Sequence, residues 1–316
     1  MTIGIGAVGE NAGLAVWKAL NAVEKVSNGS IKGFATFTII TNTSEVKYFC
    51  TQRGGSLTLF TLGDSIADQP PEEVINAPIA AVISSGPDRL EPLELYLPAE
   101  RNVGMVTGHR IPNAIGVSGK PVNVEVLELM KRGVPADMAV KKVMEENQNV
   151  DAGLIAIDVK GNCGLMNSKR VDMRPDIAKA MIFKDKTKVM VLNNEIYPVQ
   201  VAADLAAAIA MQVMSKERQP DFQVEISAGV KVQYGSEDKV IIDEHNRAIE
   251  IYTTDPTILE GRVVCVVPYL GSLVVKDGNV VGRLLNEPIT VLQDGVIVDL
   301  AGQKTMLRDV ARIDRN

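Results

Sequence analysis

The chain opens with Met1-Thr2-Ile3-Gly4-Ile5-Gly6-Ala7-Val8, in which a small hydroxyl residue leads into an apolar, partly β-branched run. Such a run predicts a buried strand at the start of the first domain. If Met1 is removed, Thr2 carries a nucleophilic hydroxyl and a free α-amine in one residue. That amine has a pKa of about 8 and can act as the base that activates the hydroxyl. The opening therefore predicts both a first strand and a candidate nucleophile.

The composition is typical of a globular chain that is long enough for two domains. Its 316 residues are 46% hydrophobic and 23% charged, and the net charge is -6. A negative net charge does not indicate the basic surface that binds nucleic acid or an anionic membrane. The sequence shows neither a secretory leader nor an apolar run of transmembrane length. We expect a cytoplasmic protein that binds a small-molecule substrate and has no nucleic-acid or membrane partner.

Several chemistries are disfavoured by the residue types. The three cysteines are far apart and form no CxxC pair, and two histidines cannot build a three-histidine site. We therefore expect neither a metal nor another cofactor. The pattern Gly4-x-Gly6-x-x-Gly9 formally matches a dinucleotide fingerprint, but no acidic residue ends a clear second strand about 20 residues later. A nucleotide-binding enzyme remains a less favoured alternative.

Periodicity predicts a mixed first domain over residues 1–217. The predicted elements are a helix at 12–27, strands at 33–40, 45–51 and 79–84, helices at 123–132 and 135–147, a strand at 151–158 and a helix at 199–214. Residues 85–122 are rich in glycine, proline and charge and are expected to be irregular. The helix at 199–214 is apolar nearly all round, so we expect it between layers or at the interface of a homo-oligomer.

A second domain is predicted over residues 218–316. The composition shifts near 215–221, and strand-rich sequence follows, with hairpin signals at 276–279 and 293–295. A short terminal helix is expected at 305–313. This β-rich domain contains no motif that can be attached to a chemistry.

Two stretches carry a resemblance to a known superfamily. One is Thr2 to Val8, and the other comprises 127–135, 139–143 and 151–158 with Gly161, read as two helices, a glycine-containing strand and a short turn. In these stretches the chain resembles the N-terminal-nucleophile hydrolases, in particular an uncharacterised bacterial branch similar to asparaginase-type proteins. The resemblance implies an α+β fold, a four-layer αββα sandwich, followed here by the smaller β-rich domain. It also implies cleavage of amide bonds.

A glycine-containing loop after the strand at 45–51 is a candidate substrate-binding segment. The backbone N–H groups of Gly54 and Gly55 can face an oxyanion, because glycine lets a ligand approach the backbone closely. Arg53 can bind a carboxylate through two parallel hydrogen bonds. A tight turn with a solvated arginine is the alternative.

Two further loops supply the other candidates. Ser85 and Asp88 follow a predicted strand and can hold an anion or position a carboxylate, although a structural turn would explain them equally well. His109 is the candidate for proton transfer near neutral pH, and Arg110 can hold a carboxylate. A histidine hydrogen-bonded within a surface loop is the alternative.

These residues lead to one favoured function and its alternatives. The favoured function is an amidohydrolase in which Thr2 attacks a small, carboxylate-bearing amide, with His109 as the second catalytic candidate. Arg53, Gly54, Gly55, Ser85, Asp88 and Arg110 would bind the substrate. The main alternative is a non-catalytic ligand-binding or structural protein with the same fold.

Overall fold

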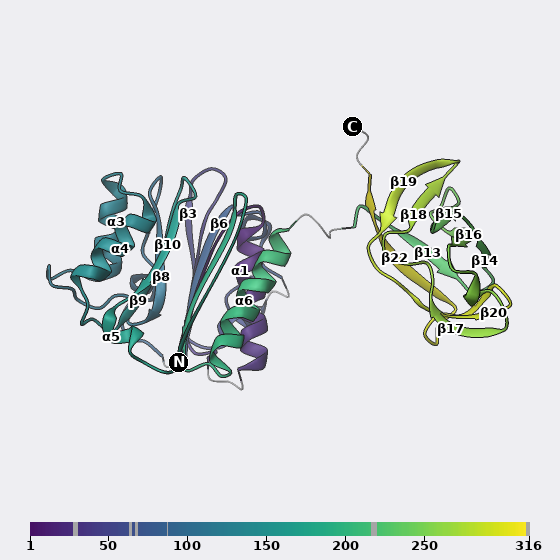
Figure 1. Ribbon diagram of the computed structural model, residues 1–316. Coiled ribbons are helices and arrows are strands. Elements are labelled where there is room, and N and C mark those ends of the chain that lie inside the picture. Colours follow the sequence, from purple (N-terminus) through teal and green to yellow (C-terminus); the bar gives the residue numbers. More distant parts are fainter. Residues whose placement is uncertain (28–30, 63–64, 67–68, 87, 216–219, 314–316) are drawn as a thin grey trace. The chain divides into compact units, whose positions relative to one another are not determined.

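A computed structural model describes residues 1–27, 31–62, 65–66, 69–86, 88–215 and 220–313 (Figure 1). The chain divides into two compact units, Met1–Ser215 and Lys216–Asn316, which are called the first and the second unit below. The domain boundary predicted between residues 217 and 218 lies outside the described residues. Each unit has a hydrophobic core of its own.

The first unit is built around a six-stranded sheet with the strand order β11-β12-β1-β6-β2-β3. Its strands are β1 (Thr2–Val8), β2 (Ala35–Ile40), β3 (Val46–Thr51), β6 (Ile79–Ser85), β11 (Ile177–Lys184) and β12 (Thr187–Asn194). All neighbours in this sheet are antiparallel. The chain's opening run, β1, therefore lies at the centre of the sheet between β12 and β6.

A second sheet of four strands has the order β10-β9-β8-β7 and is also antiparallel. Its strands are β7 (Ala99–Glu100), β8 (Gly104–Arg110), β9 (Ala152–Asp158) and β10 (Cys163–Asn167), and a separate ribbon consists of β4 (Thr61–Leu62) and β5 (Ser65–Ile66). Side chains from the inner faces of the two sheets form one shared core, which includes Ile83, Met105, Ile157 and Leu192.

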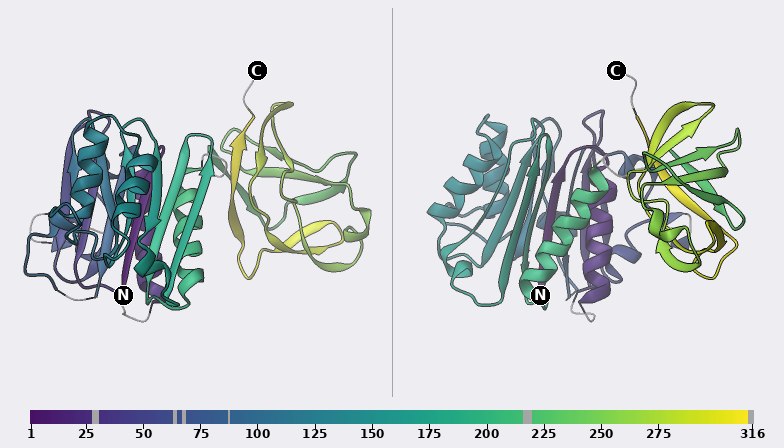
Figure 2. Two further views of the ribbon diagram at one scale, coloured as in Figure 1. Left: turned by 60° about the vertical axis from the view of Figure 1, so that its left-hand side comes forward. Right: turned by 45° about the vertical axis from the view of Figure 1, so that its right-hand side comes forward.

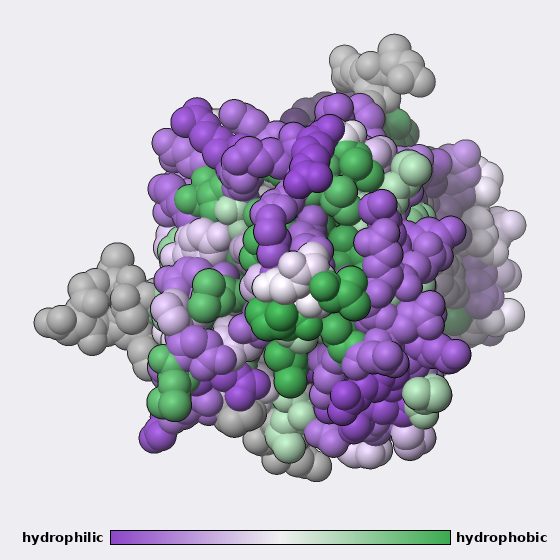
Figure 3. Space-filling view, turned by 90° about the vertical axis from the view of Figure 1, so that its left-hand side faces the viewer, coloured by the Kyte–Doolittle hydropathy of each residue, from purple (hydrophilic) through white to green (hydrophobic). Residues whose placement is uncertain are grey.

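Helices lie on the outer faces of these sheets, as Figures 1 and 2 show. The longer helices are α1 (Ala12–Val26), α3 (Val122–Lys131), α4 (Ala136–Glu146) and α6 (Val199–Met214), and the short ones are α2 (Glu72–Ile75) and α5 (Lys169–Asp172). Helices α1 and α6 pack against each other and on the six-stranded sheet, whereas α3 and α4 cover the four-stranded sheet. Figure 3 shows the α3–α4 side, where hydrophobic side chains interrupt a mostly hydrophilic surface.

The side chains of β1 point alternately to the two faces of its sheet, which explains why apolar residues and glycines alternate along it. Ile3, Ile5 and Ala7 are fully buried against the helices, and each fully buried isoleucine contributes about 1.5–3 kcal/mol. Gly4 and Gly6 face the second sheet, where a Cβ on Gly4 would overlap the carbonyl oxygen of Gly108. These glycines therefore serve close packing of two sheets inside an antiparallel strand, and the fingerprint-like spacing does not form a phosphate-binding turn.

The second unit contains a ten-stranded sheet with the order β13-β22-β19-β18-β15-β16-β14-β21-β20-β17. Its strands are β13 (Phe222–Ser227), β14 (Lys231–Tyr234), β15 (Lys239–Ile242), β16 (Ala248–Thr253), β17 (Arg262–Val266), β18 (Leu273–Lys276), β19 (Asn279–Leu284), β20 (Ile289–Gln293), β21 (Val296–Asp299) and β22 (Thr305–Arg312). Most pairs are antiparallel, while β14 with β16 and β15 with β18 are parallel. The hairpins expected at 276–279 and 293–295 are confirmed as β18–β19 and β20–β21.

The fold class predicted from the sequence, an α+β four-layer αββα sandwich followed by a smaller β-rich domain, is wrong as a description of the chain as a whole. The described residues are β-rich, with 40% strand and 24% helix, and besides the β4–β5 ribbon they form three mostly antiparallel sheets, one of them a ten-stranded half-barrel. The physical reason is long-range strand pairing, which local periodicity does not report. Residues 305–312, predicted as a helix, pair with β13 and β19, and residues 104–110, predicted as irregular, form β8.

Among the described residues, no helix combines the length and the apolar character that crossing a bilayer requires.

Candidate active site

Five buried polar side chains lie at one end of the space between the two sheets of the first unit. Thr2 begins β1 beside the ends of two strands, because it is paired with Asn194, the last residue of β12, and with Ser85, the last residue of β6. His109 and Asn167 come from the facing sheet, where both are paired with the same residue of β9. All five are buried. We call Thr2, Ser85, His109, Asn167 and Asn194 the inter-sheet polar cluster.

The Thr2 hydroxyl is held by its neighbour in the sheet. Thr2 Oγ1 lies 3.2 Å from Ser85 Oγ, and Ser85 Oγ donates its own proton to the Met1 carbonyl oxygen at 2.9 Å. A serine hydroxyl has one proton, so Thr2 is the donor in the Thr2–Ser85 hydrogen bond. The lone pairs of the Thr2 oxygen remain for another partner.

His109 is neutral and its tautomer is fixed by the hydrogen bonds around it. Burial, with the nearby Arg110 charge as a further cause, lowers the pKa of His109 from 6.5 to about 4. Asn167 Nδ2 donates to Asp172 Oδ1 at 3.0 Å, which turns Asn167 Oδ1 toward His109 Nε2 at 2.9 Å. Nε2 therefore carries the proton, and Nδ1 is an acceptor.

Two acceptors of the cluster lack a donor. Within the described ranges of the chain, neither His109 Nδ1 nor Asn194 Oδ1 has a hydrogen-bond partner of good geometry, although the Asn194 side chain lies near enough to His109 to oppose the lowering of its pKa. An unpaired buried polar atom costs about 1–3 kcal/mol, so both atoms favour a ligand that brings N–H or O–H groups. The cluster is thus suited to bind an ammonium or amide group.

Ion pairs form at the chain start, which adjoins the polar cluster because Met1 precedes Thr2 and Glu195 follows Asn194. The α-ammonium of Met1 lies 2.7 Å from Glu195 Oε2, and Arg174 Nη2 lies 3.3 Å from Glu195 Oε1 and 2.6 Å from Asp176 Oδ2. The guanidinium of Arg174 holds the pKa of Asp176 below its usual range. We call Met1, Arg174, Asp176 and Glu195 the charged rim. Because this group is partly exposed to solvent, each of its ion pairs stabilises the fold by at most about 1 kcal/mol.

The predicted carboxylate-binding arginines are engaged by aspartates. Arg110, the neighbour of His109, donates from Nε and Nη2 to Asp151 at 2.5 and 2.8 Å, and it lowers the pKa of that carboxyl. Arg53 forms an exposed bidentate pair with Asp88, with contacts of 2.6–3.2 Å. The structure therefore joins Arg53 to Asp88 at the surface and places Arg110 beside the polar cluster.

Gly54 and Gly55 lie against helix α1. The N–H of Gly54 donates to the carbonyl oxygen of Lys32 at 2.8 Å, and Gly55 packs on the carboxylate of Glu24. That buried carboxylate also accepts the N–H and hydroxyl of Ser56 at 3.0 and 2.6 Å, although burial raises the pKa of Glu24. The observed partners of this loop are therefore Lys32 and Glu24.

Other nucleophiles are less suitable than the hydroxyls of the cluster. Burial raises the pKa of the Cys50 and Cys163 thiols to about 11, so both are protonated at neutral pH. Across the described part of the chain, no group of three histidine, cysteine or acidic side chains is arranged to hold a metal ion.

Sequence reasoning missed three residues of this region: Asn167, Asn194 and Glu195. Each lies at the end of an apolar strand or directly after it, as in Met166-Asn167 and Leu192-Asn193-Asn194-Glu195. A polar residue at the end of a buried strand is a weak signal for a functional site. Its side-chain partner can be assigned only when the strand that faces it is known.

A family model, Domain of unknown function (DUF6963), matches residues 2–223 and so includes the whole polar cluster. The chain belongs to this family. A second model, Domain of unknown function (DUF7259), matches residues 229–305 in the second unit. No curated protein matches the chain. The descriptions of both matching models name no activity.

Proposed function

We propose that this protein hydrolyses an amide bond of a small, carboxylate-bearing molecule, with Thr2 as the nucleophile once Met1 has been removed. The observation that carries the proposal is the Thr2 hydroxyl, buried beside the chain start and hydrogen-bonded to Ser85 within a polar cluster. The likeness of the chain's opening to N-terminal-nucleophile hydrolases agrees with this chemistry, and the proposal rests on the site and not on the fold.

The proposed reaction has two steps. The free α-amine of Thr2 takes the proton of the hydroxyl, Oγ1 attacks the amide carbon, and the C–N bond breaks as the amine product leaves with that proton. Water then attacks the resulting ester, which releases the carboxylic acid and restores the Thr2 hydroxyl. His109 is neutral at pH 7, so its proposed role is to accept a hydrogen bond from the substrate through Nδ1.

The polar cluster and the charged rim would bind different ends of the substrate. His109 Nδ1 and Asn194 Oδ1 would accept N–H groups of the amide. Arg110 and Arg174, each oriented by an aspartate, would face the carboxylate. The substrate class that follows is a small amide with one carboxylate, such as an N-acyl amino acid.

The test combines an intact-mass measurement with Thr2 variants. We expect protein expressed without an N-terminal tag to lack Met1 and to hydrolyse members of an N-acyl amino acid panel, followed by NMR. Thr2→Ala should lose at least about 1000-fold in rate, Thr2→Ser should keep part of the activity, and Thr305→Ala, an exposed control, should match the wild type. Turnover by Thr2→Ala, or by protein that retains Met1, would refute the mechanism.

A second candidate function is ligand binding without catalysis. It is favoured by the contacts of Met1 itself, whose α-ammonium pairs with Glu195 and whose carbonyl accepts from Ser85. A protein that keeps Met1, and whose melting temperature rises with an amide that is not consumed, would support this function over hydrolysis.

The cellular setting is likewise a proposal. Cys50, Cys163 and Cys265 are free thiols, which suits a reducing compartment such as the cytoplasm. The proposed partner is a small molecule and not nucleic acid or a membrane. We also propose that the chain assembles into a homo-oligomer.

A further inference from the structure

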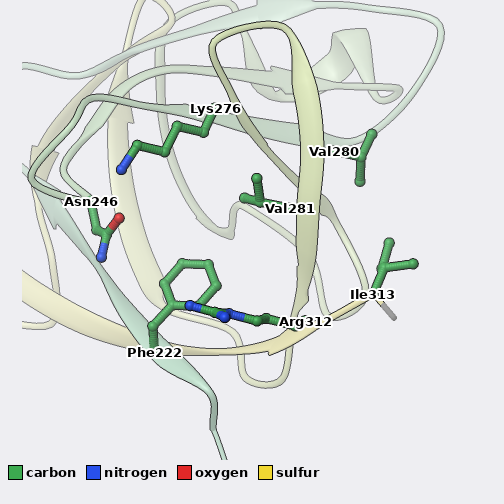
Figure 4. A pocket seen from close by; sticks show the side chains of 7 residues that line it. All are labelled: Phe222, Asn246, Lys276, Val280, Val281, Arg312 and Ile313. Atoms are coloured by element: carbon green, nitrogen blue, oxygen red, sulfur yellow. The ribbon is translucent and has the colours of Figure 1, made fainter. Parts of the chain in front are cut away.

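The second unit contains a pocket of about 420 Å³. This volume lies within the range of small-molecule sites, about 300–1,000 Å³. Side chains from four strand ends and one turn line it, and the argument uses Phe222, Asn246, Lys276, Val281 and Arg312. Figure 4 shows the Lys276 ammonium and the Asn246 amide near each other, with Phe222 and Arg312 side by side.

The polar lining of this pocket is cationic. Lys276 and Arg312 both line it, and no carboxylate side chain does so among the described lining residues. This is notable in a chain whose net charge is -6. Lys276 Nζ donates to the Glu244 carbonyl oxygen at 3.0 Å, which holds the ammonium in place without neutralising it.

Apolar groups complete the pocket. The Phe222 ring lies 6.0 Å from the Arg312 guanidinium carbon, close enough for a cation–π contact that orients the arginine. Val281 adds an aliphatic side chain to the lining. The pocket thus combines two cations, one amide and an apolar wall.

We propose that this pocket binds a small organic anion, a carboxylate attached to an apolar or aromatic body. The carboxylate would lie between Lys276 and Arg312, and the body would pack on Phe222 and Val281. Paired cations recognise the anion, whereas the apolar wall selects against a bare inorganic ion. The site is independent of the proposed hydrolysis, because all of its residues belong to the second unit.

The test is calorimetric titration of the full chain with benzoate, with benzamide as a neutral analogue of the same shape and inorganic phosphate as a bare anion. We expect benzoate to bind at least 10-fold more tightly than benzamide or phosphate. Lys276→Gln and Arg312→Gln should each weaken benzoate binding at least 5-fold, while the exposed Lys304→Gln should leave it unchanged.

Several results would overturn the proposal. Equal binding of benzoate and benzamide would remove the role of the cations, and phosphate binding as tight as benzoate would remove the role of the apolar wall. Unchanged affinity in both pocket variants would place benzoate elsewhere. Melting temperatures of the variants must stay within about 2 °C of the wild type, and a Val281→Ala variant tests the apolar wall separately if either charge variant unfolds.

Discussion

His109 titrates far from its usual range because it is enclosed between two sheets. Its pKa is about 4 in the folded protein and 6.5 without the fold. Between these values the unfolded chain binds a proton that the folded chain does not, so the free energy of unfolding falls as the pH falls from 6.5 toward 4. His109 therefore lowers the free energy of unfolding by about 2 kcal/mol when the pH falls from 7.5 to 5.

This loss should disappear in His109→Gln, which cannot titrate in that window. The measurement is urea unfolding of both proteins at pH 7.5 and pH 5, compared as the difference in stability between the two pH values. His245→Gln is the matched control, because the other histidine of the chain is exposed on a turn. An equal pH dependence in wild type and His109→Gln would show that His109 does not carry it.

At the scale of elements, the sequence predicts the long helices of the first unit better than its strands, whereas the helix predicted at 305–313 is strand β22. The helices at 12–27, 123–132, 135–147 and 199–214 are confirmed within one residue at each end, because one face of each repeats apolar residues at helical spacing. Strand β8 was missed since its sequence, Gly-Met-Val-Thr-Gly-His-Arg, resembles a loop. A Cβ at its Gly108 would lie 2.0 Å from the carbonyl oxygen of Gly153 on the neighbouring strand β9, and local sequence does not show this close approach.

The candidate site was predictable only in part for the same reason. Thr2, Ser85 and His109 were chosen from local sequence, and the structure gathers them at one end of the inter-sheet space. Asn167 and Asn194 join them only through the register of β10 and β12. Register is set by pairing between residues far apart in the chain, so single-sequence reasoning could not assign these partners.

Close packing of β1 on the second sheet gives a prediction at this scale. A Cβ on Gly4 would overlap the backbone of Gly108, which cannot move without separating the sheets. A Cβ on Gly6 would lie 2.8 Å from the flexible Cδ1 end of Ile157. Gly4→Ala should therefore destabilise the first unit by about 3 kcal/mol or more, and Gly6→Ala by about 1 kcal/mol.

Urea unfolding of the two variants, followed by the fluorescence of Trp17, measures this difference. Both substitutions lie on the same strand and change the same residue type, so each controls for the other in strand propensity. Equal destabilisation by the two alanines would contradict the assignment of Gly4 as the closest approach between the sheets.

At the scale of the whole molecule, the two units should unfold as separate cooperative transitions. The first unit has cores on both sides of its six-stranded sheet, and the second unit has its own core within the ten-stranded sheet. Leu20 on α1 and Leu292 on β20 are both fully buried, one in each unit. Replacing either by alanine should cost about 2–5 kcal/mol in its own unit alone.

Calorimetry of the full chain, combined with the fluorescence of its one tryptophan, separates these transitions. Trp17 lies on α1 and hydrogen-bonds to the Ser56 carbonyl, so its signal reports the first unit. Leu20→Ala should shift the fluorescence transition to lower temperature, whereas Leu292→Ala should shift only a calorimetric transition that fluorescence does not see. If Leu292→Ala moved the tryptophan signal equally, the two units would form one cooperative system, and ligand binding in the second unit would then also stabilise the polar cluster of the first.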